Sequence, residues 1–593
     1  MNCPKTNYKK TAWSAAWGGT KVGALVVACI LLLTATAVAG NGNGKVAKDL
    51  DETKLGSQQV DVIVQYKTTP ASKHFDKANK HGAKLKNQFA AIKAAHYSVR
   101  ADEVAKLADE DSDIAYVSPD RPVQASGYTA QFEAVNGDIA QGRGYNGAGV
   151  TVAVIDSGIG SHSDIASSRI VYKQDFTGQG TDDQYGHGTH VAGIIGGNGY
   201  KSGNGGCSSC FLTYMGIAPQ VKFVSLKVLD RNGAGTDSNV IAAINRAIAL
   251  KSTYNIKIIN LSLGRGVYES YATDPLTQAV ESAWKAGIFV VVAAGNYGRD
   301  NSNGRNGYGT ITSPGNDPYV ITVGAMRTFG TDVRSDDVVT SYSSKGPSFI
   351  DHVVKPDIVA AGNKVVSTLA PNASLDANYP TTLVPLTDYQ DTGSTSKSTL
   401  YFRLSGTSMA APQVAGAAAL LLQRYSTLTP DQLKARLMKT AYKDLTLYST
   451  STDATTGITY EEQADIFTVG AGYLDTDAAL NNTDSASTSV GVAKSPTVSY
   501  NSSTGQVTLV NGSSVLWGSS VIWGSSVVWG SSVIWGSNAS GQSVLWGSSV
   551  IWGSSATQGF SVLWGSSVTP TSVIWGSNTS ASSAMSVLTD GDQ

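Results

Sequence analysis

The sequence predicts an α/β fold with a mostly parallel central sheet, in the middle of the 593-residue chain. Short apolar runs alternate there with stretches of helical periodicity, as they do when helices cover a parallel sheet. The runs are apolar at consecutive positions, which indicates strands buried on both faces. We expect buried strands at 150–155, 221–228, 256–261, 289–293 and 320–325, and helices at 239–250, 275–286, 407–423 and 430–440.

The N-terminal segment has the three parts of a secretory signal. Four lysines precede the apolar run Val22–Ala39, which closes on small residues. A positive region, an apolar run and a small-residue cleavage site are typical of exported proteins. We therefore expect a signal peptide at 1–39 and a protein that is secreted or held at the extracellular surface. The run is also just long enough to span a bilayer, so a retained N-terminal membrane anchor is the alternative.

A small α+β unit is expected between the signal and the main domain. After a spacer at 40–57, residues 60–67 alternate like a strand, helical patterns follow at 86–95 and 101–108, and 114–123 is again strand-like. These elements define a unit at 58–126. The main domain then occupies 127–481.

Only two cysteines, Cys207 and Cys210, remain once the predicted signal is removed. A CysSerSerCys spacing suggests a redox motif or half of a zinc site in a cytosolic protein. No second cysteine pair completes such a zinc site, and exported proteins meet oxidising conditions. A local disulfide between Cys207 and Cys210 is the preferred interpretation.

The charge pattern excludes one class of partner. The net charge is −1, and charged residues make up 15% of the chain. No basic region suggests binding to nucleic acid, which requires positive charge against phosphates. No nucleic-acid partner is expected.

The C-terminal part contains a tryptophan repeat, SSV[IL]WG, at 511–577, after a Ser/Thr/Asn-rich linker at 482–510 and before a tail at 578–593. Each copy suits a short Val-Ile/Leu-Trp strand closed by a Gly-Ser-Ser turn. Such strands must stack on one another, which predicts a small β-solenoid or a meander; a low-complexity tail is the alternative. Exposed tryptophans suit contact with a cell surface or a polysaccharide. The repeated tryptophans are Trp517, Trp523, Trp529, Trp535, Trp546, Trp552, Trp564 and Trp575.

Polar residues follow three of the predicted strands. Asp156 comes after the first strand, Ser262–Gly264 after the third, and Asn296 shortly after the fourth. Because parallel strands end at one edge of a sheet, these groups are expected to lie near one another.

Two predicted helix starts add a base and a nucleophile. His187 lies in HisGlyThrHisValAlaGly and Ser408 in GlyThrSerMetAlaAlaPro. A serine becomes a nucleophile only when a base takes its proton and a third group orients that base. Taken singly, Asp156 and Ser408 could be helix or turn caps, and His187 with His190 could bind a metal.

Together these motifs make the chain resemble the subtilisin family of serine peptidases. Asp156 in VIDSGI, His187 in HGTHVAG and Ser408 in GTSMAAP match the family's catalytic motifs, in the family's order. Asn296 in VVVAAGN matches its oxyanion-hole asparagine. The resemblance covers about 350 residues and implies a subtilisin-like three-layer fold. Residues 58–126 resemble the family's inhibitory propeptide, which implies synthesis as a zymogen.

The resemblance also implies a role for each residue. His187 would act as the base for Ser408, Asp156 would orient His187, and Asn296 with the Ser408 N–H would bind the oxyanion. The family's substrate pocket maps to residues on two walls and a floor. Its first wall is Ser262, Leu263 and Gly264, its second wall is Ala293, Ala294 and Gly295, and its floor is Thr312.

The implied activity is that of a secreted serine endopeptidase, acting on proteins or peptides through an acyl-enzyme without a cofactor. The alternative is a surface-attachment or structural protein dominated by its tryptophan repeat. Asp164 matches a position that binds calcium in many relatives, but the loop that completes that site is replaced here by the segment around Cys207 and Cys210. A structural calcium ion therefore stays an open prediction. The segment 368–404 is longer than usual in the family.

Overall fold

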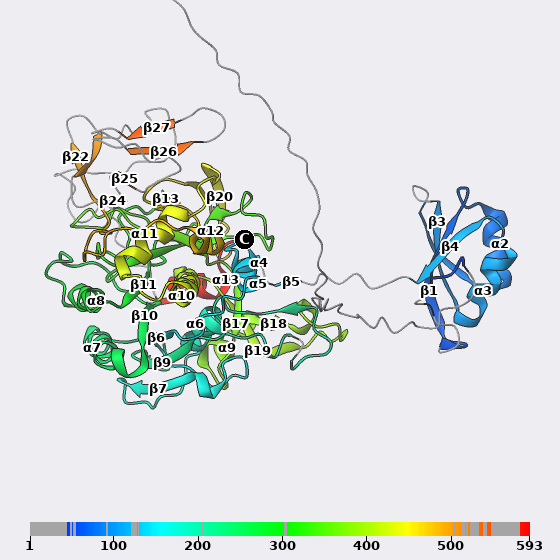
Figure 1. The fold of residues 1–593 in the computed structure, drawn as a ribbon, viewed down its shortest axis with the longest axis horizontal. Coiled ribbons are helices and arrows are strands. Elements are labelled where there is room, and N and C mark those ends of the chain that lie inside the picture. Colours follow the sequence, from blue (N-terminus) through cyan, green and yellow to red (C-terminus); the bar gives the residue numbers. More distant parts are fainter. Residues whose placement is uncertain are drawn as a thin grey trace, which may run out of the picture. The chain divides into compact units, whose positions relative to one another are not determined.

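A computed structural model gives the fold of the protein (Figure 1). The predicted signal peptide and most of the predicted tryptophan repeat lie outside the residues that it describes. The described residues are 44–47, 50, 55–89, 93–119, 127–128, 130–203, 205–301, 305–501, 506–510, 516–517, 520–521, 533–537, 543–546 and 581–593. The chain divides into a first unit, residues 1–124, and a second unit, residues 125–593.

In its described residues, the first unit has a four-stranded antiparallel sheet in the order β2-β3-β1-β4, with helices α2 and α3. Apolar residues that alternate along β1 and β3, such as Val62, Val64 and Val99, are fully buried in a core of their own. The elements are β1 (Gln59–Tyr66), α2 (Ser72–Lys80), β2 (Lys84–Phe89), β3 (Ala94–Arg100), α3 (Ala101–Glu110) and β4 (Ile114–Pro119).

The prediction of a helix at 86–95 is wrong. Of the described residues in this range, 86–89 belong to β2 and 94–95 to β3, whereas helix α2 lies earlier in the chain. β2 is an edge strand whose side chains are mostly exposed, so its sequence carries no strand-like alternation of apolar residues. Pairing with β3 decides its conformation, as tertiary context commonly overrides local propensity.

The second unit is built on an eight-stranded sheet in the order β15-β14-β11-β10-β6-β9-β7, with β16 also beside β14. All of its pairings are parallel except that of β14 with β15. The strands are β6 (Thr151–Asp156), β7 (Ile170–Asp175), β9 (Lys222–Lys227), β10 (Ile256–Leu261), β11 (Phe289–Ala293), β14 (Ile321–Arg327), β15 (Val338–Val339) and β16 (Ile358–Ala361).

Two pairs of helices pack on this sheet: α6 with α10, and α7 with α8. The central strands β6 and β11 are buried at every position, so both faces of the sheet are covered. The predicted α/β fold with a mostly parallel sheet is confirmed. The helices are α4 (Ala130–Glu133), α5 (Gly137–Gly142), α6 (His187–Gly196), α7 (Asp237–Tyr254), α8 (Pro275–Lys285), α10 (Thr407–Arg424), α11 (Pro430–Thr440) and α12 (Thr476–Asn481).

The long segment 368–404 folds onto the loop that carries the two cysteines. Its strands form a small sheet in the order β17-β19-β18, and the Phe211 N–H donates to the Tyr389 carbonyl. Cys207 and Cys210 are joined by a disulfide. The elements of the segment and its flanks are β17 (Val365–Thr368), α9 (Ser374–Asn378), η3 (Pro380–Thr382), β18 (Leu383–Pro385), η4 (Leu386–Asp388) and β19 (Lys397–Leu404).

The remaining elements are short, and some belong to the predicted linker and repeat. Described pieces of the repeat pair as antiparallel strands, β24 with β25 and β26 with β27. A solenoid or meander stays a prediction. These elements are β5 (Gly127–Tyr128), η2 (Ser167–Arg169), β8 (Leu212–Thr213), β12 (Arg299–Asp300), β13 (Arg305–Asn306), β20 (Tyr448–Thr452), β21 (Thr459–Gln463), β22 (Thr497–Asn501), β23 (Gln506–Val510), β24 (Leu516–Trp517), β25 (Ser520–Val521), β26 (Val533–Ser537), β27 (Ser543–Trp546) and α13 (Ala581–Asp590).

Two segments expected to lie outside the main domain are packed on the second unit. Two residues of the predicted linker bond to the main domain: the Pro496 carbonyl accepts from the Val354 N–H, and the Val498 N–H donates to the His352 carbonyl. In the predicted tail, α13 buries Val587 in the main core. Within the described part of the chain, no helix is long and apolar enough to cross a membrane.

Candidate active site

The candidate site lies where three neighbouring strands end. β6 ends at Asp156, β10 leads into Ser262, and β11 leads into Asn296. Two helices begin at the same place, α6 with His187 and α10 just before Ser408. A cleft of about 540 Å³ opens there, lined by His187, Asn296 and Ser408 among others. This edge of the sheet thus brings together Asp156, Ser262 and Asn296, which follow strands in the sequence.

Asp156 and His187 form a buried pair. The His187 Nδ1 lies 2.8 Å from Asp156 Oδ1 and 3.0 Å from Oδ2. Asp156 is 0% exposed and His187 5% exposed. Asp156 Oδ1 also accepts a hydrogen bond from the Ser157 N–H at 2.7 Å, which fixes the carboxylate. This pairing places the proton of a neutral His187 on Nδ1, so Nε2 is free to accept one.

Ser408 lies in the first turn of α10, beside the cleft. Its hydroxyl donates to the Ser262 carbonyl at 3.1 Å. Among the described residues it makes no hydrogen bond to His187, so the side chain must rotate before His187 can take its proton. The position near the N-terminus of a helix favours negative charge developing on this residue.

The Asn296 carboxamide is oriented by Thr407. Asn296 Oδ1 accepts hydrogen bonds from the Thr407 N–H at 2.9 Å and from its hydroxyl at 3.1 Å. Gly406 makes room for this arrangement, since a Cβ there would lie 3.0 Å from Asn296 Nδ2, and its φ of +144° suits glycine. With Oδ1 occupied, Nδ2 is the end that can donate to a ligand.

The predicted substrate residues fall into two groups. Six of the seven line the cleft, whereas Ala294 lies behind its wall. The Ala294 N–H donates to Val323 in the next strand, and its carbonyl accepts from the Thr312 N–H. The six lining residues are Ser262, Leu263, Gly264, Ala293, Gly295 and Thr312.

Comparison with known proteins gives the family. The sequence pattern of the Subtilase family, Peptidase_S8, matches residues 147–514, more than half of the chain. The chain belongs to the subtilase family. The family prediction is confirmed, and the match extends through the segment predicted as a linker.

This subtilase is similar to several bacterial proteases. It is 39% identical to serine protease AprX of Bacillus subtilis (strain 168), over 50% of this chain and 62% of AprX, so it spans less than two thirds of that relative. It is 34% identical to subtilisin DY of Bacillus licheniformis, over 52% of this chain and 89% of that protein. A crystal structure of a cold-adapted subtilisin-like serine proteinase is 32% identical, over 51% of this chain and 85% of that chain, with a TM-score of 0.35.

Sequence reasoning missed Asp183, which holds the loop before α6 in this subtilase. Its fully buried carboxylate accepts hydrogen bonds from the Ser157 hydroxyl at 2.8 Å, the Gly186 N–H at 2.7 Å and the Thr189 hydroxyl at 2.6 Å. Burial raises the pKa of Asp183 despite these bonds. Since Ser157 follows Asp156 and Gly186 precedes His187, Asp183 fixes the spacing of that pair. Its position four residues before His187 is the signal that could have found it.

Sequence reasoning also missed Thr407, next to Ser408. Besides contacting Asn296, its hydroxyl accepts a hydrogen bond at 3.1 Å from the N–H of Gly295, the residue before Asn296. Thr407 therefore positions the carboxamide.

His190 has a structural place in this subtilase. Its Nε2 lies 3.1 Å from the Val365 carbonyl, and its ring packs edge-on against Phe402. Burial lowers the pKa of His190 to about 3, so the ring is neutral near pH 7. Its Nε2 is thus engaged with a backbone carbonyl, and the described residues place no group of three His, Cys, Asp or Glu to hold a metal ion with His187 and His190.

The residues around Asp164 do not fit a calcium site. Tyr401, from β19, donates its hydroxyl to Asp164 Oδ2 at 2.6 Å, and the Lys201 N–H donates to Oδ1 at 2.8 Å. Calcium needs six to eight oxygen ligands, and among the described residues no group of three His, Cys, Asp or Glu is placed to hold a metal. The long segment 368–404 thus supplies a hydroxyl partner for this carboxylate.

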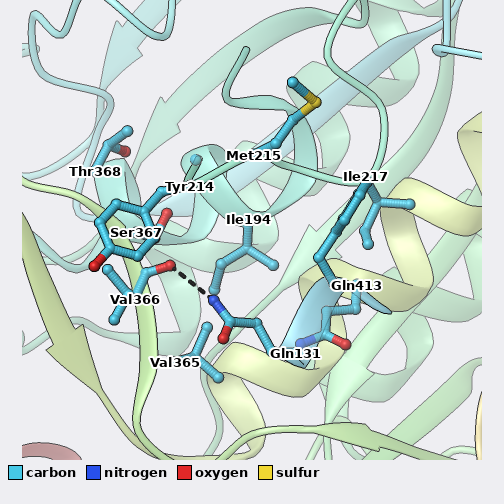
Figure 2. A pocket seen from close by; sticks show the side chains of 12 residues that line it. Gln131, Ile194, Tyr214, Met215, Ile217, Val365, Val366, Ser367, Thr368 and Gln413 are labelled. Atoms are coloured by element: carbon cyan, nitrogen blue, oxygen red, sulfur yellow. Dashed lines mark hydrogen bonds between the residues drawn. The ribbon is translucent and has the colours of Figure 1, made fainter. Parts of the chain in front are cut away.

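A second pocket is too small for a substrate. Figure 2 shows it between Ile194, Tyr214, Met215 and Val365, with Gln131 donating to the Val366 carbonyl at 3.2 Å. Its volume is about 10 Å³, roughly the space of one water molecule. The cleft at Ser408, at about 540 Å³, is far larger.

The His187 pair leads to a pH prediction. Burial of the imidazole works to lower the pKa of His187, but the charge and hydrogen bond of Asp156 outweigh burial and raise it above its ordinary value. His187 must be neutral to accept a proton, so kcat/KM falls as the pH drops through this pKa. We expect the acid limb of kcat/KM, measured from pH 4 to 9, to have a midpoint above about 6.5. A midpoint below that value would contradict the coupling of His187 to Asp156.

Proposed function

We propose that this subtilase is a serine endopeptidase that cleaves proteins or peptides through an acyl-enzyme. The carrying observation is the buried Asp156–His187 pair, which faces the same cleft as Ser408. In the proposed reaction, Ser408 rotates toward His187, gives its proton to Nε2, and attacks the scissile carbonyl. His187 then passes that proton to the departing amine, and water releases the acyl group by the reverse sequence. Asp156 stabilises the charged imidazole in between.

The tetrahedral oxyanion would be held by the Asn296 Nδ2 and the Ser408 N–H. We expect Asn296→Ala to lower kcat about 10²–10³-fold with little change in KM, the scale found for the corresponding donor in subtilisin itself. Steady-state kinetics on a peptide substrate would measure this, with the exposed Asn481→Ala as the control. An unchanged kcat in Asn296→Ala removes this side chain from the mechanism.

The substrate would lie with its acyl side along Ser262–Gly264 and a side chain in the pocket above Thr312. An added strand on this segment gives main-chain hydrogen bonds that depend little on sequence. The six lining residues of this pocket named above are uncharged, which favours uncharged side chains before the scissile bond. No cofactor takes part in this chemistry.

Synthesis as a zymogen is part of the proposal, with residues 58–126 as an inhibitory propeptide. In support, the first unit has its own core and sheet, so it can act as a separate body. The parallel sheet of the second unit joins strands far apart in sequence, which makes folding slow and a template useful. We expect the chain without residues 40–126 to recover activity on refolding several times more slowly, and added segment 58–126 to restore the rate and then inhibit. Equal refolding rates with and without the segment would contradict this role.

Export and surface contact complete the proposal. The signal-like N-terminus predicts secretion, and the tryptophan repeat is the candidate contact with a cell surface or polysaccharide. A chain lacking only residues 511–577 separates the two functions, because it keeps α13 on the second unit. Undiminished secretion and casein cleavage by this chain would make the repeat an accessory to the protease.

The deciding test of the function is covalent labelling of the full chain with a fluorophosphonate, which reacts with an activated serine. The wild type should label and cleave casein, and Ser408→Ala should do neither. Labelling that persists in Ser408→Ala would assign the nucleophile to another residue.

A further inference from the structure

Residues 581–593 return to the second unit beyond the tryptophan repeat and pack on β19 and on the backbone just before α10. We call them the returning segment; α13 is drawn in red near α10 in Figure 1. The Ser405 N–H donates to the Leu588 carbonyl at 2.8 Å, three residues before Ser408. Val587 and Leu588 are buried in the main core. A segment distant in sequence is therefore part of the surroundings of the nucleophile.

Asp592 anchors the returning segment. Its carboxylate accepts hydrogen bonds from the Arg299 guanidinium at 2.8 Å and from the Ser341 N–H at 2.7 Å. Its own N–H and carbonyl pair with the Asn363 carboxamide at 2.9 and 3.0 Å. Asp592 is 0% exposed and Arg299 7% exposed. Undocking the segment would break this buried ion pair and these hydrogen bonds together and leave Arg299 with only Asp453 as a carboxylate partner, so the segment is held firmly in place.

The path of the segment is also fixed by Gly591. Its φ is +63°, and a Cβ there would lie 2.4 Å from both the Asn363 Oδ1 and the Ser405 Oγ. A larger residue would push the segment away from Ser405. The close approach beside the catalytic helix therefore depends on a glycine at this position.

Met585 and Leu588 line the same cleft as His187 and Ser408. The acyl side of a substrate is placed along Ser262–Gly264 by the proposed function, on which this inference rests. The chain after the scissile bond must leave away from that segment. Met585 and Leu588 line the cleft outside the acyl-side walls, and Leu588 is bound to the backbone of Ser405, three residues before Ser408. We propose that the returning segment forms the wall of the leaving-group side, where Met585 and Leu588 select apolar side chains.

The cleft keeps about 540 Å³ with the segment in place. A blocking peptide would fill that space and would be held by contacts that release easily. The buried anchor at Asp592 instead makes the segment a permanent part of the site.

The test uses the full mature chain and two kinds of substrate. Internally quenched peptides share one sequence before the scissile bond and carry Leu, Phe, Ala, Asp or Lys at the two positions after it. A peptide p-nitroanilide has the same acyl side and a constant leaving group. The variants are Met585→Ala, Leu588→Ala and the double change, with Ser586→Ala as a control, since Ser586 lies on the same helix and does not line the cleft.

We expect the wild type to prefer Leu over Asp after the scissile bond, and the double variant to lose about tenfold of that preference. The p-nitroanilide, whose single ring reaches only the first position of this wall, should lose less activity than the Leu peptide. Met585→Trp keeps the test valid if Leu588→Ala unfolds. Because Met585 is only half-buried, the larger ring should narrow the cleft and disfavour Phe relative to Ala.

Three results would overturn the proposal in distinguishable ways. An unchanged preference in folded, active variants means that the segment is not a wall. Faster cleavage of every substrate, the p-nitroanilide included, means that it obstructs the cleft. A wild-type chain that neither labels with fluorophosphonate nor cleaves any peptide refutes the proposed protease function itself.

Discussion

Ser408→Ala is expected to lower kcat by about 10⁶-fold while the chain stays folded, the scale found when the nucleophile of subtilisin is removed. The reason is that the proposed acyl-enzyme forms on the Ser408 hydroxyl, whereas the nearby Ser262 and Thr407 hydroxyls donate to the Ser408 carbonyl and to Asn296 Oδ1. Ser408 begins a buried helix but its hydroxyl makes one hydrogen bond, to Ser262, so its loss changes packing little.

The measurement is hydrolysis of a peptide substrate at saturating concentration, with thermal unfolding to verify the fold. Ser426→Ala, an exposed serine just after the end of the same helix, is the matched control and should keep full activity. Residual turnover in Ser408→Ala within tenfold of the wild type would place the nucleophile elsewhere.

Asp156→Asn is expected to lower kcat by about 10⁴-fold, as for the equivalent change in other serine proteases. An asparagine presents an N–H where the carboxylate accepts the His187 Nδ1 proton at 2.8 Å. The imidazole would then carry its proton on Nε2 and could not accept one from Ser408. Asp156 also raises the pKa of His187 against the effect of burial. The remaining activity should therefore have its acid limb at lower pH.

This shift of the acid limb distinguishes a role of Asp156 in orienting His187 from a merely structural role of Asp156. The pH dependence of kcat/KM would be compared for the wild type, Asp156→Asn and Asp182→Asn, an exposed neighbour in the loop before α6. Asp182→Asn should have the same pH dependence of kcat/KM as the wild type. If Asp156→Asn lost activity with an unmoved acid limb, Asp156 would not control the titration of His187.

The central sheet could be predicted because most of its strands have a recognisable pattern in the local sequence. β6, β10 and β11 are short, mostly apolar runs, and all of their residues except Lys257 are buried, as expected of strands covered on both faces. Strand β7, at the edge, mixes Ile and Val with Lys, Gln and Asp, and all six of its residues are half-buried. Its conformation comes from pairing with β9, which a local pattern does not record.

The residues around the site also divide into those that a local motif reveals and those that it does not. Asp156, His187, Asn296 and Ser408 follow strand ends or begin helices, so motifs reveal them. Arg299 and Asp592, by contrast, are 293 positions apart, and each is an ordinary charged residue in its own context. Their pairing exists only in the folded molecule. Long-range partners of this kind carry no signal in one sequence.

The chain is attached to the second unit both before and after the tryptophan repeat, and this affects how freely the length of the repeat can change. Thr497 is paired with Val353 before the repeat, and α13 is docked after it, so the intervening chain begins and ends at fixed points on one body. Even for a chain without structure, doubling such a loop costs only about 0.6 kcal/mol. Whole copies of the hexapeptide can thus be gained or lost while the enzyme keeps its stability. Copy number is free to vary between variants of this protein, whereas the residues at the two attachment points are not.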